Sequence, residues 1–145
     1  MTQNRQTIVI LCEDRQQYVF ARYFLQKKGL TGKFIDRSCP SGRQAGEQYV
    51  RERYALEVKA HRSKNYLNIC LIVVIDADKG TVAERIKQLD SVLEEKRHYK
   101  EKIAIFVPRR NIRFVGKQKQ CIEATSHLFP HFNPYLNKHT LIEIN

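Results

Sequence analysis

Three continuous apolar runs constrain the fold of this chain more than any other feature of its sequence. They are "TIVILC" at 7–12, "NICLIVVI" at 68–75 and "KIAIFV" at 102–107. Strands that are covered on both faces, as in parallel sheets, have continuous apolar runs, whereas half-exposed strands alternate apolar and polar residues. The three runs therefore predict buried strands of a parallel sheet.

Amphipathic helical patterns lie between these runs. One covers 15–28 and is followed by Gly29, a common helix stop; the others cover about 47–61 and 81–95. The segment "KFIDRS" at 33–38 is a more polar strand candidate. Strands and helices that alternate in this way are typical of α/β proteins. We expect one Rossmann-like domain with a mostly parallel, four-stranded sheet flanked by helices.

The periodic signal fades after Arg110. The last part of the chain contains two prolines and no clean period, although "LIEI" at 141–144 is a candidate last strand. A length of 145 residues suits a single core. We therefore expect a domain over residues 1–111 and a C-terminal extension, 112–145, that packs on the same domain.

The charge of the chain predicts a polyanionic partner. Lys and Arg number 26 against 15 Asp and Glu, which gives a net charge of +11. Nucleic acid is the leading candidate for such a basic domain, although solvated surface charge is the plainer explanation. The four cysteines form no C-x-x-C pair, and no apolar run suits a signal peptide or a membrane span. We expect reduced thiols and a cytoplasmic protein.

Acidic residues follow two of the apolar runs directly. Ligands of open parallel α/β sheets bind beyond the carboxyl ends of the strands, where these residues fall. Helix capping accounts for only some of the acids, because "TVAE" at 81–84 forms its own capping box and Asp14 can cap the first helix together with Gln17. Three carboxylates then have no task in folding, namely Glu13, Asp76 and Asp78.

These three acids predict a metal site. Asp76 and Asp78 are two residues apart, so in an extended strand their side chains point to the same side. Grouped carboxylates repel one another unless a cation lies between them. Oxygen ligands of this kind suit Mg²⁺ or Mn²⁺, which polarise a phosphoryl oxygen and help to ionise an attacking water.

The combination of a glutamate after the first strand and a D-x-D pair after a later strand resembles the Toprim family. The motifs are "LCED", with Glu13, and "VVIDADKG", with Asp76 and Asp78, and the resemblance spans about residues 7–111. That family includes topoisomerases, primases and OLD-family nucleases. The resemblance implies that the three acids bind Mg²⁺ and act catalytically on phosphodiester bonds. Similarity to nucleases of phage-defence loci also implies a separate ATPase subunit as a partner.

The segments "GEQYVRER" and "FVPRRNI" look like those of small prokaryotic Toprim-like proteins. In that pattern the arginine segment continues with Asn-Ile-Glu and then a tryptophan. Here Arg113 stands where the acid is expected, and the chain has no Trp. If that acid is a further metal ligand, its replacement weakens or abolishes activity.

Several basic and polar residues are candidates for contacts with substrate phosphates. Each has solvated surface charge as its alternative explanation. A loop with two glycines, "CPSGRQAGE", adds a weaker candidate phosphate cradle ahead of a helix. The candidates for binding nucleic acid or phosphate are Arg43, Lys79, Arg109, Arg110 and Asn111.

The sequence thus favours a Mg²⁺- or Mn²⁺-dependent phosphodiester hydrolase, an endonuclease acting on DNA or RNA. One alternative is a subunit that binds nucleic acid or a complex but has lost the chemistry. A less favoured alternative is a phosphatase of the haloacid dehalogenase type, because "DADKGT" approaches the D-x-D-x-Thr motif of that family. Its threonine is one position late, and the motif follows the third strand instead of the first.

Overall fold

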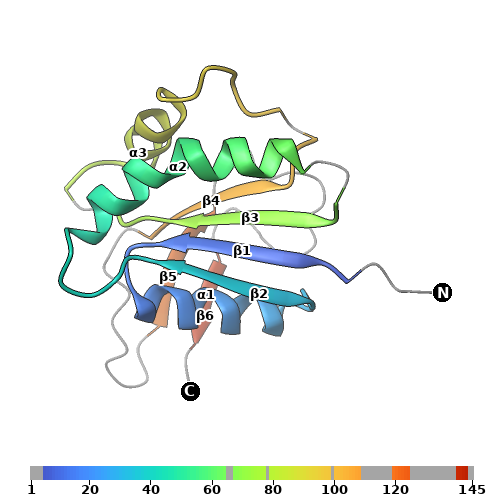
Figure 1. Cartoon of the computed structure of the whole chain (residues 1–145). Helices are drawn as coiled ribbons and strands as arrows, with labels where there is room; N and C mark the ends of the chain where they lie inside the picture. The colour runs from blue at the N-terminus through green and yellow to red at the C-terminus, as the bar shows by residue number, and fades with distance from the viewer. Residues whose placement is uncertain are drawn as a thin grey trace.

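The chain folds into an α/β domain with a parallel sheet between two layers of helices (Figure 1). A computed structural model describes residues 5–64, 67–77, 79–98 and 100–108, together with the backbone of two strands at 119–124 and 140–143. The parallel strands are β1 (Thr7–Cys12), β2 (Lys33–Ser38), β3 (Ile69–Val74) and β4 (Ile103–Pro108), and the helices are α1 (Arg15–Lys27), α2 (Gly46–Ser63) and α3 (Val82–Asp90). The expected Rossmann-like architecture with four parallel strands is confirmed.

The sheet has the strand order β2-β1-β3-β4-β5-β6. The last two strands, β5 (Lys119–Ala124) and β6 (Thr140–Glu143), pair antiparallel, β5 with β4 and β6 with β5. β6 overlaps the candidate strand "LIEI", whereas β5 has too polar a sequence to have been predicted. Helix α1 covers one face of the sheet, and α2 and α3 cover the other (Figure 1).

The burial of each strand explains its sequence. β3 and β4 lie inside the sheet with helices on their faces, and their apolar side chains are almost fully buried. β2 is the edge strand and is only half-buried, which accounts for its polar residues. Cys12 and Cys70 are buried core residues with free thiols. No helix in the described part of the chain is long and apolar enough to cross a membrane.

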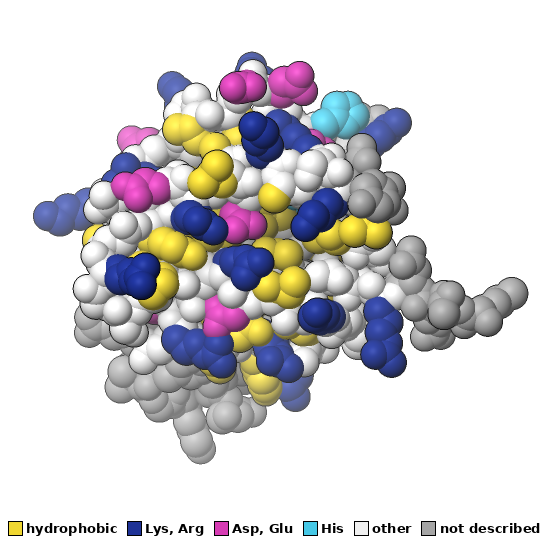
Figure 2. Space-filling view, viewed as in Figure 1, with side chains coloured by type: hydrophobic (Ala, Val, Ile, Leu, Met, Phe, Trp, Pro, Cys, Tyr) yellow, Lys and Arg dark blue, Asp and Glu magenta, His cyan; other side chains and the backbone are white. Residues whose placement is uncertain are grey.

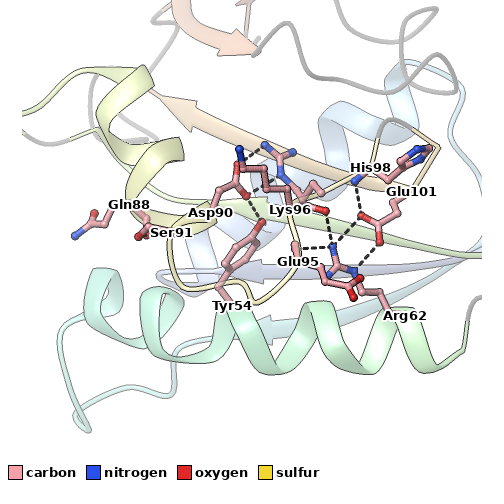
Figure 3. Close-up of polar contacts among 10 residues, drawn as sticks. Tyr54, Arg62, Gln88, Asp90, Ser91, Glu95, Lys96, His98 and Glu101 are labelled. Carbon is pink, nitrogen blue, oxygen red and sulfur yellow. Dashed lines mark hydrogen bonds and ion pairs between the residues drawn. The ribbon is translucent and has the colours of Figure 1, made fainter.

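The helix expected over 81–95 is shorter in the structure and ends at Asp90. The Asp90 carboxylate accepts hydrogen bonds from the buried Tyr54 hydroxyl and from both Nε and Nη2 of Arg97, each at 2.8 Å (Figure 3). The chain must turn after Asp90 to bring Arg97 back to it. The Ser91 hydroxyl also donates to the Gln88 carbonyl, a bond that competes with helical pairing. Tertiary contacts therefore end the helix before its apolar period does.

Arg62 of α2 holds the segment that follows. Its guanidinium donates to the backbone carbonyls of Glu95 and Lys96 and to both carboxylate oxygens of Glu101 (Figure 3). Burial alone would raise the pKa of Glu101, but the hydrogen bonds from Arg62 and from the His98 amide hold the pKa below its usual value. These contacts tie the connection between α3 and β4 to α2.

Replacing Tyr54 by Phe tests this network. The hydroxyl of Tyr54 is buried and donates to Asp90, so Tyr54→Phe should lower the free energy of unfolding by about 1–2 kcal/mol. Urea unfolding followed by circular dichroism measures the change. Tyr49→Phe is the matched control, because no hydrogen bond of the Tyr49 hydroxyl is found within the described residues, and it should change stability by less than about 0.5 kcal/mol. Equal effects of the two changes would contradict the role given to Tyr54.

Candidate functional site

The carboxyl ends of β1 and β3 lie side by side and place Glu13 next to Asp76. β1 and β3 are neighbours in register, with Cys12 opposite Val74. Extended pairing continues past the end of β3, because the amides of Ile75 and Ala77 donate to β4 carbonyls at 3.1 and 3.0 Å. Asp76 therefore lies in an extended segment that still pairs with β4.

The two carboxylates share one hydrogen-bond donor, the side-chain amide of Gln17. Gln17 Nε2 donates to Glu13 Oε2 at 2.7 Å and to Asp76 Oδ1 at 3.1 Å. The backbone amide of Asp76 also donates to Glu13 Oε2, at 3.2 Å. Two acids 63 residues apart in the sequence are thus held at one point of the sheet edge.

Gln17 is a residue of the site that the sequence analysis assigned only to capping. Asp14 caps α1 as expected, because its Oδ1 accepts from the backbone N–H of Gln17 at 2.7 Å. The side chain of Gln17, however, accepts from the Glu13 amide at 2.9 Å and bridges the two acids, and only 1% of Gln17 is exposed. The four-residue spacing from Glu13 to Gln17, across the start of a helix, was the available signal.

Arg85 of α3 is the second residue that the sequence analysis missed. Its Nε donates to the Asp76 carbonyl at 2.9 Å, and its Nη1 donates to Glu47 Oε1 at 2.6 Å. Glu47 lies in the first turn of α2 and also accepts from Arg51 at 3.2 Å. This chain of contacts fixes α2 and α3 around the end of β3.

The pKa values of Glu13 and Glu47 are shifted in opposite directions. Burial raises the pKa of the Glu13 carboxyl above its usual value, and the hydrogen bonds from Asp76 and Gln17 and the charge of Arg85 offset only part of that effect. Burial also acts to raise the pKa of Glu47, but the hydrogen bonds from Arg51 and Arg85 outweigh it and lower the pKa. Glu13 is therefore the carboxylate whose charge the protein compensates less completely.

The glycine-containing loop approaches the same place. A Cβ on Gly46 would lie 2.4 Å from the Glu13 carbonyl oxygen and 2.7 Å from its Cβ, so only glycine lets the start of α2 pack here. This close approach explains why position 46 is a glycine. The side chains of Arg43, in the β2–α2 loop, and Lys79, between β3 and α3, are exposed.

The remaining predicted site residues fall outside the described part of the chain. They are Asp78, Arg109, Arg110 and Asn111, and the same holds for Arg113. The structure therefore places two of the three predicted metal-binding acids, Glu13 and Asp76, and brings them together.

The carboxylate oxygens of Glu13 and Asp76 are suitable ligands for a hard divalent cation. Within the described residues no group of three or more His, Cys, Asp or Glu side chains can hold a metal ion. Mg²⁺, however, usually keeps several waters and binds through one or two carboxylates together with substrate phosphates. Glu13 and Asp76 meet that requirement with two oxygen ligands, and a cation beside them would compensate the incompletely balanced charge of Glu13.

Fold and site geometry define a Rossmann-like α/β domain with two acids at the carboxyl edge of its parallel sheet. Comparison with protein-family models, curated proteins and solved structures finds no match to the chain. The likeness to the Toprim family therefore depends on the motif residues alone.

Replacing Gln17 by Leu tests whether its amide holds the two acids. The change removes the donor shared by Glu13 and Asp76 and leaves both carboxylates partly buried without it, which should cost about 2–3 kcal/mol of unfolding free energy. Gln16→Leu, at an exposed neighbouring position, is the control and should change stability by less than about 0.5 kcal/mol. Chemical unfolding measures both, and a small effect of Gln17→Leu would show that the bridge is dispensable.

Proposed function

We propose that the protein is a Mg²⁺- or Mn²⁺-dependent phosphodiester hydrolase of the Toprim type that acts on nucleic acid. The observation that carries this proposal is the meeting of Glu13 and Asp76, from two different strands, at the carboxyl edge of the parallel sheet. Open α/β sheets bind their ligands at this edge. Folding gains little from placing two acids together there, because like charges repel.

The residues of the site have separable tasks in this proposal. Glu13 and Asp76 hold the cation, which supplies Lewis-acid stabilisation of the phosphoryl oxygens when it is bound. Gln17 fixes the relative orientation of the two carboxylates through its side-chain amide. Arg85 fixes the backbone carbonyl of Asp76 and is itself held by Glu47, so that it helps to position the acid.

The charge of the protein supports nucleic acid as the substrate. The net charge of +11 favours a polyanion, and the exposed side chains of Arg43 and Lys79 belong to loops at the carboxyl ends of β2 and β3. These two cations are suited to contact phosphates on either side of the bond to be cut. Asp78, which follows Asp76 by two residues, would complete the acidic set that the Toprim resemblance implies.

A cleavage assay tests the proposal. We expect the purified protein to cut labelled single- or double-stranded DNA or RNA with Mg²⁺ or Mn²⁺ and not with EDTA. Glu13→Gln and Asp76→Asn should each lower the rate at least about 100-fold, because loss of groups that merely support a metal ligand already costs roughly 10–100-fold. Glu94→Gln, which removes an exposed carboxylate beyond α3, is the matched control and should retain activity.

Metal binding measured without substrate tests cation binding by Glu13 and Asp76 separately from hydrolysis. Titration calorimetry with Mn²⁺ should show weaker binding to Glu13→Gln and Asp76→Asn and unchanged binding to Glu94→Gln. Nucleic-acid binding without cleavage, unaffected by EDTA and by Asp76→Asn, would instead identify a subunit that keeps the fold and has lost the chemistry.

A further inference from the structure

One segment of the described chain carries a marked excess of positive charge. Between Arg15 and Ser38 there are six basic residues and one acidic residue, so this segment of α1 and β2 carries +5 of the net charge of +11. Between Lys79 and Pro108, the segment with α3 and β4, seven basic residues are balanced by five acidic ones. This segment lies on one side of the fold and has the largest charge excess within the described residues; a further +4 belongs to residues 109–145, most of which lie outside the described part of the chain.

The outward face of α1 and the edge strand β2 form that side, which we call the α1–β2 face. Helical spacing places Arg15, Val19, Arg22, Tyr23 and Lys27 on the exposed side of α1, and Val19 and Tyr23 are 45% and 46% exposed. β2 runs along the edge of the sheet beside β1, with exposed Lys33 and Arg37. Figure 2 shows Lys and Arg side chains distributed over the described surface, including the part with α1 and β2 in the lower half of the view.

Most cations of the α1–β2 face have no acidic partner among the described residues. Arg15 pairs with Asp36, and Arg37 lies 3.7 Å from Glu57. For Arg22, Lys27, Lys28 and Lys33 no carboxylate of the described residues lies within salt-bridge distance.

Aromatic rings hold some of these cations in place. The Arg22 guanidinium lies 5.4 Å from the centre of the Phe34 ring of β2, and Lys27 Nζ lies 5.4 Å from the centre of the Tyr23 ring. Such contacts order the side chains while their charge remains uncompensated. The face therefore presents positioned cations beside a half-exposed aromatic ring.

Purely structural roles explain only part of this pattern. Lys27 and Lys28 are favourable near the carbonyl end of the α1 dipole, and charge at Lys33 discourages pairing of another strand with the edge. Neither reason applies to Arg22 in the middle of α1, nor to the exposure of Tyr23 and Val19 beside it.

The positive charge and the exposed tyrosine of the α1–β2 face favour nucleic acid as its partner. A second copy of the chain would bring +5 against +5 and be repelled, whereas phosphates would neutralise the cations. An exposed tyrosine among cations is the pattern on which bases of single strands stack. α1 also begins two residues after Glu13 and extends about 20 Å from the site, so a strand bound at the acids can continue along it.

We infer that the α1–β2 face binds the backbone of single-stranded nucleic acid and guides it to the acidic edge of the sheet. The inference rests on the proposed function for the identity of the substrate, but it does not require that the substrate be cut.

Fluorescence anisotropy with labelled oligonucleotides of about 20 nucleotides tests the inference. Binding is measured in EDTA with the Asp76→Ala protein, so that no cleavage interferes. The triple variant R22E/K27E/K33E should bind single strands at least about tenfold more weakly near 0.1 M salt, and the slope of log affinity against log salt should fall by about 2. The matched control K59E/K87E/K96E changes the net charge by the same amount at exposed positions of α2, α3 and the following loop, and should lose less than about threefold.

Tyr23→Ala separates stacking from charge. It should weaken binding of single strands by about fivefold or more and leave the salt slope unchanged, because a base–aromatic stack carries no charge. Equal losses in the two triple variants would show that net charge alone matters and would overturn the inference, as would tight binding of polyglutamate without binding of oligonucleotides. Binding through this face by a protein that cuts nothing with Mg²⁺ or Mn²⁺ would leave the inference standing and refute the hydrolase proposal.

Discussion

The parallel pairing of β1 with β3 is the constraint on which the candidate site depends. It brings together residues that are 63 positions apart in the sequence, and its register sets Glu13 beside Asp76. A slip of one residue would turn the side chain of Asp76 to the other face of the sheet and separate the acids. The buried apolar side chains of β1 and β3 oppose such a slip, because each would have to repack in a different place within the close-packed core. The hydrophobic core therefore positions the site as well as stabilising the fold.

The surroundings of Glu13 compensate its charge only in part. Gln17 supplies neutral amide hydrogens, and Arg85, which donates to the Asp76 carbonyl, is itself paired with Glu47. Burial consequently prevails at Glu13 and its pKa is raised. The incomplete compensation is typical of functional sites, where ionisable groups are held in costly surroundings.

The sequence predicted the buried strands from their local apolar pattern. It predicted the position of the acids from the general rule that ligands bind at the carboxyl edge of a parallel sheet. Continuous apolar runs predicted buried strands, and their carboxyl ends predicted where Glu13 and Asp76 meet. It did not predict Gln17 as a bridge, because that contact spans 59 residues to Asp76 and the same residue also fits a capping motif. The early end of α3 depends on Asp90, which Tyr54 and Arg97 bind from elsewhere in the fold. Such side-chain contacts leave no periodic signal.

The separation of charges along α1 lets an acidic site and a basic face coexist in one small domain. α1 has 13 residues and so spans about 20 Å, whereas charges in 0.1 M salt are screened over about 10 Å. Lys27 and Lys33, at the far end of α1 and the start of β2, are therefore too distant to neutralise Glu13 or Asp76. Their attraction for a polyanion and the attraction of the acids for a cation do not cancel. A phosphodiester backbone can satisfy both at once, because it carries charge along its length and binds a cation at any one phosphate.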